Sequence, residues 1–239
     1  MTFLYCFSYK AIEIDPQHTL SYFNKGNTLF KLEKYEEAIE CYDKAMKIDP
    51  QDSDSCYNKG YALYELGKYE EAIEYYDKAI ETNPQHALSY CNKGYVLSKF
   101  GKYQEAIECC DKAIETDPQD SDSHCNKGSS LSKLGEYQEA IECYDKAIEI
   151  DPRHSVSYCN KGNSLSKLGK HQEAIECYDK AIEIDPQDSD SYYNKGNVLS
   201  KLEKYQEAIE CYDKAIEINP QGGDSCLEKN NALHNLNKL

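Results

Sequence analysis

Seven prolines follow one another at a constant interval of 34 residues along this chain of 239 residues. They are Pro16, Pro50, Pro84, Pro118, Pro152, Pro186 and Pro220. The glycine of a recurring Asn-Lys-Gly triplet keeps the same interval. A fixed period of this length indicates a tandem repeat, in which each unit is one supersecondary element that buries its apolar face against its neighbours. The period defines six full units, which are 19–52, 53–86, 87–120, 121–154, 155–188 and 189–222.

Each unit reads as two helices. In the third unit, apolar and small residues recur at steps of three or four residues over 90–100 and again over 103–114, which is the periodicity of amphipathic helices. Pro118 ends the second helix. Gly94 lies on the apolar face of the first helix, so we expect the two helices to cross closely there.

A turn separates the two helices. Gly101 follows the first helix of the third unit and can adopt the positive φ that such a turn requires. Glu33 and Glu203 hold the same place in the first and last full units.

The units resemble the tetratricopeptide repeat (TPR). Numbered from 1 to 34, a unit of that family favours an aromatic residue at position 4, Gly or Ala at 8, a large residue at 11 and Ala at 20. It then favours an aromatic at 24, Ala at 27 and Pro at 32. The first full unit supplies Tyr22, Gly26, Leu29, Ala38, Tyr42, Ala45 and Pro50. The resemblance implies an all-α TPR solenoid, a right-handed superhelix of stacked antiparallel helix pairs in a single array over 1–239.

One position departs from the family's pattern. Position 7, where the family usually has Leu, is lysine here. The residues are Lys25, Lys59, Lys93, Lys127, Lys161 and Lys195.

The two ends hold half units. Residues 1–18 resemble the end of a second helix without its first, and residues 223–239 resemble a lone first helix that acts as a C-terminal cap. The apolar run Phe3–Phe7 is too short for a signal peptide. The uncapped N-terminal end predicts either a longer array or self-association.

The charge excludes two classes of partner. Lys and Arg number 27 against 43 Asp and Glu, a formal net charge of -16. This balance speaks against nucleic-acid binding and against docking on anionic lipid, which both rest on positive charge. No stretch is apolar enough to span a membrane.

The twelve cysteines predict packing rather than chemistry. Most share position 23 or position 5, where other units have an aromatic residue, as expected of a half-buried packing position. These are Cys41, Cys109, Cys143, Cys177 and Cys211, and then Cys91, Cys125 and Cys159. No Cys-x-x-Cys pair is present, so we expect reduced structural thiols, a cytoplasmic location, no metal and no cofactor.

Nothing in the sequence indicates catalysis. The histidines do not converge, since His18, His86 and His154 share position 34, a turn that we expect to be exposed. Motifs of hydrolases, metalloproteases and phosphate-binding loops are missing, and the carboxylates repeat with the unit instead of forming one unique pair. We therefore expect a protein that is not an enzyme.

The candidate binding residues lie on the first helices, which the TPR resemblance places along a concave groove. Position 6 is asparagine in every full unit, at Asn24, Asn58, Asn92, Asn126, Asn160 and Asn194. Position 9 adds Asn27, Asn163 and Asn197, and position 13 adds Lys31, Lys99, Lys133, Lys167 and Lys201. An amide can donate to and accept from a peptide backbone, so these residues predict a peptide-binding ladder. The alternative is that the position-6 asparagines bond neighbouring helices and only fix the stacking of the units.

The partner's charge follows from the distribution along the unit. Positions 1–15 of the six units hold 11 Lys against 6 Asp and Glu, whereas positions 16–34 hold 13 Lys and Arg against 33 Asp and Glu. A groove on the first helices is thus more positive than the second helices, which favours an acidic or C-terminal carboxylate segment as partner. The rival is a basic partner on the acidic second helices. The carboxylate clamp with which some TPR proteins bind chaperones is missing, because position 5 lacks its lysine.

The sequence thus predicts a non-enzymatic scaffold that binds an extended segment of a protein or peptide partner. Two alternatives stay open: a structural, self-assembling repeat protein, or a targeting fragment of a larger enzyme.

Overall fold

The computed structural model describes residues 11–238, and within that range its only regular secondary structure is the α-helix. Residues 11–14 are helical, and thirteen further helices follow in this described range. They are α2 (Thr19–Phe30), α3 (Tyr35–Ile48), α4 (Ser53–Glu65), α5 (Tyr69–Thr82), α6 (Ala87–Lys99), α7 (Tyr103–Thr116), α8 (Ser121–Leu134), α9 (Tyr137–Ile150), α10 (Ser155–Lys167), α11 (His171–Ile184), α12 (Ser189–Lys201), α13 (Tyr205–Ile218) and α14 (Gly223–Leu236). The predicted all-α solenoid of helix pairs is confirmed.

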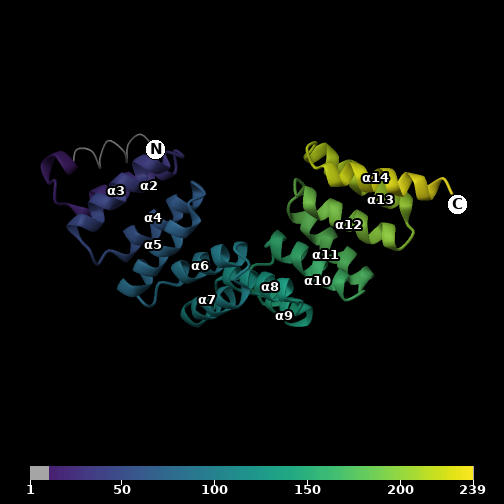
Figure 1. Ribbon diagram of the computed structural model, residues 1–239, viewed down its shortest axis with the longest axis horizontal. Coiled ribbons are helices and arrows are strands. Elements are labelled where there is room, and N and C mark those ends of the chain that lie inside the picture. The colour runs from purple at the N-terminus through teal and green to yellow at the C-terminus, as the bar shows by residue number, and fades with distance from the viewer. Residues whose placement is uncertain (1–10, 239) are drawn as a thin grey trace. The chain divides into compact units, whose positions relative to one another are not determined.

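The chain divides into two compact units, residues 1–118 with α2 to α7 and residues 119–239 with α8 to α14 (Figure 1). Within each of them, a first and a second helix pack as an antiparallel pair, and each pair packs on the next. One continuous array over 1–239 stays a prediction. Most of the expected half unit at 1–18, with Phe3–Phe7 and the uncapped end, lies outside the described residues.

The helices pair closely because the first helix has no side chain at position 8. A Cβ atom on Gly94 would lie 2.9 Å from Sγ of Cys110, so the predicted close crossing is confirmed. In unit 155–188, a Cβ atom on Gly162 would lie 2.7 Å from Cε1 of Tyr178, and the Tyr178 side chain is fully buried. An aromatic ring thus occupies the space that the glycine leaves.

The turn within each pair uses the left-handed region of the backbone. Gly101 has a φ of 74°, as predicted. Glu33 and Glu203 adopt φ values of 59° and 61° in the same place, although a residue with a Cβ atom is strained there.

Two kinds of side chain cap the first helices. Asp52 and Asp120 accept a hydrogen bond from the backbone N–H three residues later. His86 and His154 do the same through Nδ1, at 3.2 Å from the backbone nitrogen of the following Ser89 and Ser157. The prediction of an exposed turn position is wrong for these two histidines, because as caps their side chains are only 10% and 14% exposed.

Ion pairs link neighbouring repeats. The lysine at position 7 contacts the aspartate at position 25 of the preceding repeat, with 2.5 Å between Nζ and Oδ1. The pairs are Lys59–Asp43, Lys93–Asp77, Lys161–Asp145, Lys195–Asp179 and Lys229–Asp213. In these five pairs, the lysine that departs from the family's pattern joins its repeat to the one before it.

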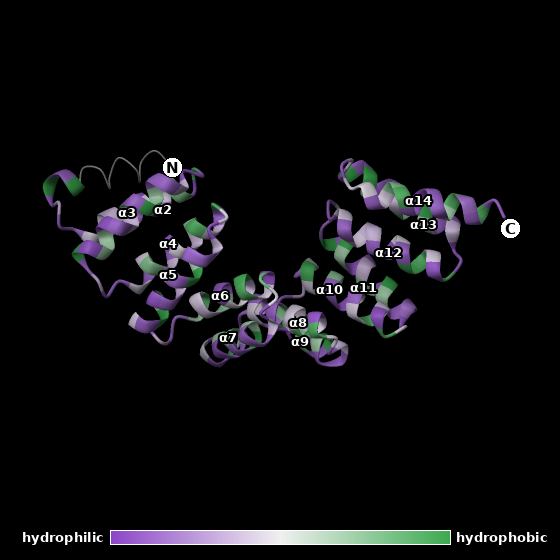
Figure 2. Cartoon of the chain, viewed as in Figure 1, coloured by the Kyte–Doolittle hydropathy of each residue, from purple (hydrophilic) through white to green (hydrophobic). Residues whose placement is uncertain are grey.

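Apolar and hydrophilic segments alternate along the helices, as their amphipathic pattern requires (Figure 2). Among residues 11–238, none of the helices combines the length and the apolar character needed to cross a bilayer.

Candidate functional site

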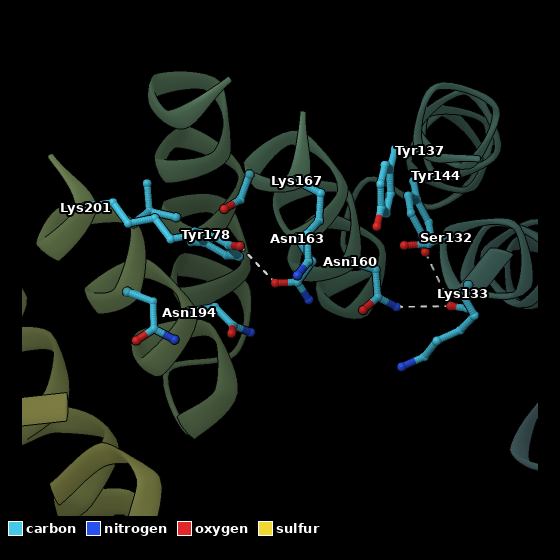
Figure 3. A pocket seen from close by; sticks show the side chains of 14 residues that line it. Ser132, Lys133, Tyr137, Tyr144, Asn160, Asn163, Lys167, Tyr178, Asn194 and Lys201 are labelled. Atoms are coloured by element: carbon cyan, nitrogen blue, oxygen red, sulfur yellow. Dashed lines mark hydrogen bonds between the residues drawn. The ribbon is translucent and has the colours of Figure 1, made fainter. Parts of the chain in front are cut away.

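A cavity of about 520 Å³ opens on the first helices of residues 119–239 (Figure 3). Its walls come from α8, α10 and α12, and its floor from tyrosines of α9 and α11. Half of the fourteen predicted binding residues line it. They are Asn160, Asn163, Asn194, Asn197, Lys133, Lys167 and Lys201.

The floor is held by buried tyrosine hydroxyls. Tyr178 donates a hydrogen bond to Oδ1 of Asn163 at 2.8 Å, and Tyr144 donates to Oγ of Ser129 at 3.5 Å (Figure 3). Burial raises the pKa of both phenols, so they stay protonated donors at neutral pH. The position-9 side chains are therefore oriented by the second helix of their own repeat.

The position-6 asparagines link adjacent repeats. The amide Nδ2 of Asn160 donates to Oγ of Ser129 at 3.3 Å, across one repeat boundary. In the other compact unit, Asn58 donates to Oδ1 of Asn27 at 3.3 Å and Asn92 to the hydroxyl of Tyr57 at 3.0 Å. The stacking role is therefore present in the structure. In Asn160 the same Nδ2 also lies 4.0 Å from Sγ of Cys125, while the amide has a carbonyl oxygen as acceptor besides.

The cavity is positively charged. Its lining contains Lys133, Lys167 and Lys201, all exposed, and no carboxylate. Ser129, Ser132 and Ser166, together with the asparagine amides, supply neutral donors and acceptors. The arrangement can hold an extended polar segment and can neutralise negative charge, while the residues that line it offer no nucleophile paired with a base.

The remaining predicted residues lie elsewhere. Asn126 is on α8 and is not part of the cavity lining. The other six lie on or next to the first helices of residues 1–118. They are Asn24, Asn27, Lys31, Asn58, Asn92 and Lys99. In that compact unit Nζ of Lys99 lies 4.9 Å from the ring centre of Tyr95.

Sequence reasoning missed part of the lining. Ser129, Ser132 and Ser166 occupy positions 9 and 12 of their repeats, next to the predicted asparagines and lysines. Tyr144 and Tyr178 occupy position 24, where the family's pattern favours an aromatic residue. Helical periodicity could have indicated the serines, because positions 6, 9, 12 and 13 lie on one side of the first helix.

No group of three or more histidines, cysteines or carboxylates within the described residues is arranged to hold a metal ion. All eleven cysteines in this part of the chain are free thiols.

The family model of the tetratricopeptide repeat matches residues 53–86, 87–120, 121–154, 155–188 and 189–221. A second tetratricopeptide repeat model matches 9–40, and a TPR repeat model matches 26–67. No curated protein matches the chain.

Solved structures share the fold. A chain of the APC/C hetero-tetramer Cut9–Hcn1 is 18% identical with a TM-score of 0.86, over 97% of this chain and 46% of that one. This chain thus spans less than half the length of that relative. PilF of Pseudomonas aeruginosa is 20% identical with a TM-score of 0.76, over 89% of this chain and 95% of PilF. YrrB, a TPR protein with an unusual peptide-binding site, is 27% identical with a TM-score of 0.61, over 80% of this chain and 99% of YrrB.

The five matches of the first model cover 53–221 in consecutive copies, and each begins where a unit defined by the prolines begins. The helix pairs of the structure keep the same register. The chain therefore belongs to the tetratricopeptide repeat family.

Proposed function

We propose that the cavity on α8, α10 and α12 binds an extended peptide segment of a partner protein, and that this segment carries acidic side chains or a C-terminal carboxylate. The family supports the general role, because TPR proteins are generally non-enzymatic scaffolds for protein interactions. The observation that carries the finer proposal is the lining of three lysines without a carboxylate.

The geometry suits a peptide backbone. Amides and hydroxyls along the walls can replace the water that a peptide gives up on binding, and the lysines add charge-assisted hydrogen bonds to carboxylates. Because the chain as a whole is acidic, a local positive site also attracts an acidic segment selectively. YrrB supports the proposal as a similar protein with a peptide-binding site.

The test uses a fluorescent acidic peptide with a free C-terminus, its C-terminal amide, and a lysine-containing counterpart. Replacing Lys133, Lys167 and Lys201 together with Glu should weaken binding of the acidic peptide by about a hundredfold, since each lysine contributes a charge-assisted contact. Lys47→Glu, at an exposed position of α3 in the other compact unit, is the control and should leave binding unchanged. Unchanged or tighter binding after the triple substitution would overturn the proposal.

A second candidate is the basic partner on the acidic second helices, and one observation favours it. Two further cavities repeat at equivalent positions, one in each compact unit, and carboxylates outnumber lysines in both. Glu173, Glu176 and Asp179 line the first, of about 520 Å³. The lysine-containing peptide measures this candidate in the same experiment. Light scattering tests self-assembly, and a catalytic domain encoded next to the repeats would support the targeting fragment.

We also propose a cytoplasmic, reducing location. Seven of the eleven described thiols are buried, and burial raises the pKa of Cys159 and Cys177 to about 11, which keeps them protonated and unreactive. Most thiols should react with Ellman's reagent only after denaturation. Native disulfides within the chain would contradict this location.

A further inference from the structure

One repeat departs from the others on the face that forms the cavity elsewhere. At positions 5, 9, 12 and 13, unit 53–86 carries Tyr57, Tyr61, Tyr64 and Glu65. Unit 155–188 has cysteine, asparagine, serine and lysine at these places. Position 13 is lysine in all five other full units, so Glu65 reverses the charge at this position.

These tyrosines continue into an aromatic surface. We use this name for Phe30, Tyr35, Tyr57, Tyr61, Tyr64 and Tyr95. The ring centres of Phe30 and Tyr61 lie 5.0 Å apart, and those of Tyr64 and Tyr95 lie 5.9 Å apart. The Tyr57, Tyr61 and Tyr64 rings are stacked at 6.2–6.3 Å with interplanar angles of 19–22°. All six side chains are half-buried, so the surface stays in part open to a partner.

Negative charge lies beside these rings. Glu65 and Glu33 are exposed, and both act on the Tyr35 phenol, whose pKa is raised by desolvation and then by these two carboxylates. Desolvation and then the Glu65 carboxylate likewise raise the pKa of Tyr61. The surface therefore combines ring faces with carboxylates, the chemistry that attracts a cation.

The tyrosine at position 9 of this repeat replaces a hydrogen bond that other repeats make there. In four other repeats the tyrosine at position 24 donates to the side chain at position 9, as Tyr178 does to Asn163. In unit 53–86 position 9 is Tyr61, and the fully buried Tyr76 hydroxyl lacks the position-9 acceptor that the other four tyrosines have. The repeat gives up an internal hydrogen bond to place a ring at position 9.

We propose that the aromatic surface and Glu65 bind a basic side chain of a partner, an arginine. A guanidinium is planar and can stack on the tyrosine faces while it donates two parallel hydrogen bonds to the Glu65 carboxylate. The aromatic surface already contacts one cation, since Nζ of Lys99 lies 4.9 Å from the ring centre of Tyr95. The proposal is independent of the lysine-lined cavity, which lies in the other compact unit and has the opposite charge preference.

The test compares three short peptides that differ only in carrying arginine, lysine or glutamate, titrated into the full chain by calorimetry. The arginine peptide should bind more tightly than the lysine peptide. Glu65→Lys installs the residue of the other five repeats and should weaken binding of the arginine peptide by about tenfold or more. Lys167→Glu is the matched control in the other compact unit and should leave the arginine peptide unaffected while it weakens the acidic peptide.

Tyr61→Asn separates binding from folding. It restores the position-9 acceptor for the Tyr76 hydroxyl, so the unfolding midpoint should hold or rise while binding of the arginine peptide falls. Equal affinity of the arginine peptide for the wild type, Glu65→Lys and Tyr61→Asn would overturn the proposal. Tighter binding of the lysine peptide than of the arginine peptide would overturn it as well.

Discussion

At the scale of single residues, the same position serves packing and the candidate site at once. Asn163 faces the cavity, yet its Oδ1 accepts the hydrogen bond of the buried Tyr178 hydroxyl. Asn160 likewise contributes to the lining while it links two repeats through Ser129. The two interpretations of the asparagines, ladder and stacking, are therefore compatible in one side chain.

Replacing Asn163 with Ala should lower the free energy of unfolding by about 1–3 kcal/mol, because it leaves the Tyr178 hydroxyl buried without an acceptor. Urea unfolding followed by circular dichroism measures the loss. Adding Tyr178→Phe should cost less than the sum of the two single substitutions, since the orphaned hydroxyl is then gone. Asn24→Ala, at an exposed position of α2, is the control. Equal effects of Asn163→Ala and Asn24→Ala would show that the hydrogen bond contributes nothing.

His154 should make stability depend on pH. Its hydrogen bond with Asp122, 3.0 Å from Nε2 to Oδ1, raises its pKa above 6.5 and outweighs desolvation, and the charges of Asp122 and Asp151 add to this. The same bond holds the pKa of Asp122 below 3.8. The pair's contribution is therefore complete below the ordinary histidine pKa and is lost as the pH rises through the folded value.

Unfolding midpoints at about pH 5.5 and about pH 8.5 measure this dependence. Asp122→Asn should reduce the difference between the two midpoints. A difference that is the same in the wild type and in Asp122→Asn would contradict the assignment to this pair.

At the scale of elements, the pairing of helices depends on two backbone features that a sequence can show. Gly162 admits the Tyr178 ring at the crossing, and Gly169, with a φ of 77°, reverses the chain between α10 and α11. Glu203 makes the same turn between α12 and α13, although its Cβ atom is strained at the positive φ of 61°.

Glu203→Gly should raise the free energy of unfolding by about 0.5–1 kcal/mol, because glycine adopts positive φ without the Cβ clash. Gly169→Ala is the reverse experiment and should lower it by about 1 kcal/mol. Thermal unfolding of the two variants beside the wild type is sufficient. A destabilised Glu203→Gly would mean that the glutamate makes contacts that outweigh the strain.

The sequence predicted the features that depend on local periodicity: the two helices of each repeat, the crossing at Gly94 and the turn at Gly101. It did not predict the contacts that cross from one element to another, such as the contact between His86 and Asp54 or the ion pair between Lys59 and Asp43. These depend on how one repeat is rotated against the next, and the period does not specify that rotation.

A signal for the histidine caps was nevertheless present. The units that end in histidine, 53–86 and 121–154, carry aspartate at position 2, where Asp54 and Asp122 contact those histidines. The candidate site was predicted in part for the same reason. Its asparagines and lysines recur with the period, whereas its net charge depends on which carboxylates the fold places outside the cavity lining.

At the scale of the whole molecule, each helix within a compact unit packs on its neighbours in sequence, and the first helices contact those of the adjacent repeat only slightly. Stability is then a sum over repeats and the surfaces between them. The site follows the same rule, since its walls are equivalent faces of three successive repeats.

Deleting unit 155–188 should therefore leave a folded helical chain with a lower unfolding midpoint. The deletion joins equivalent positions, so α12 can pack on α9 as α10 does. Circular dichroism should show the same helix content per residue as the full chain. Loss of helix across the remaining repeats would indicate cooperative dependence on that unit instead of summed neighbour contacts.

The contacts within a repeat and the contacts between repeats differ, and this difference has a mechanical consequence. Within a repeat, the Tyr178 ring seated against Gly162 resists any sliding of the helices. Between repeats, Lys195 and Asp179 form an ion pair. The Asp179 side chain is about half exposed to solvent, so added salt weakens this ion pair. Under tension, neighbouring repeats should part before either hairpin opens, and the force needed should fall as ionic strength rises. The repeats are then rigid units, and the ionic strength of the solution sets how easily the contacts between them deform.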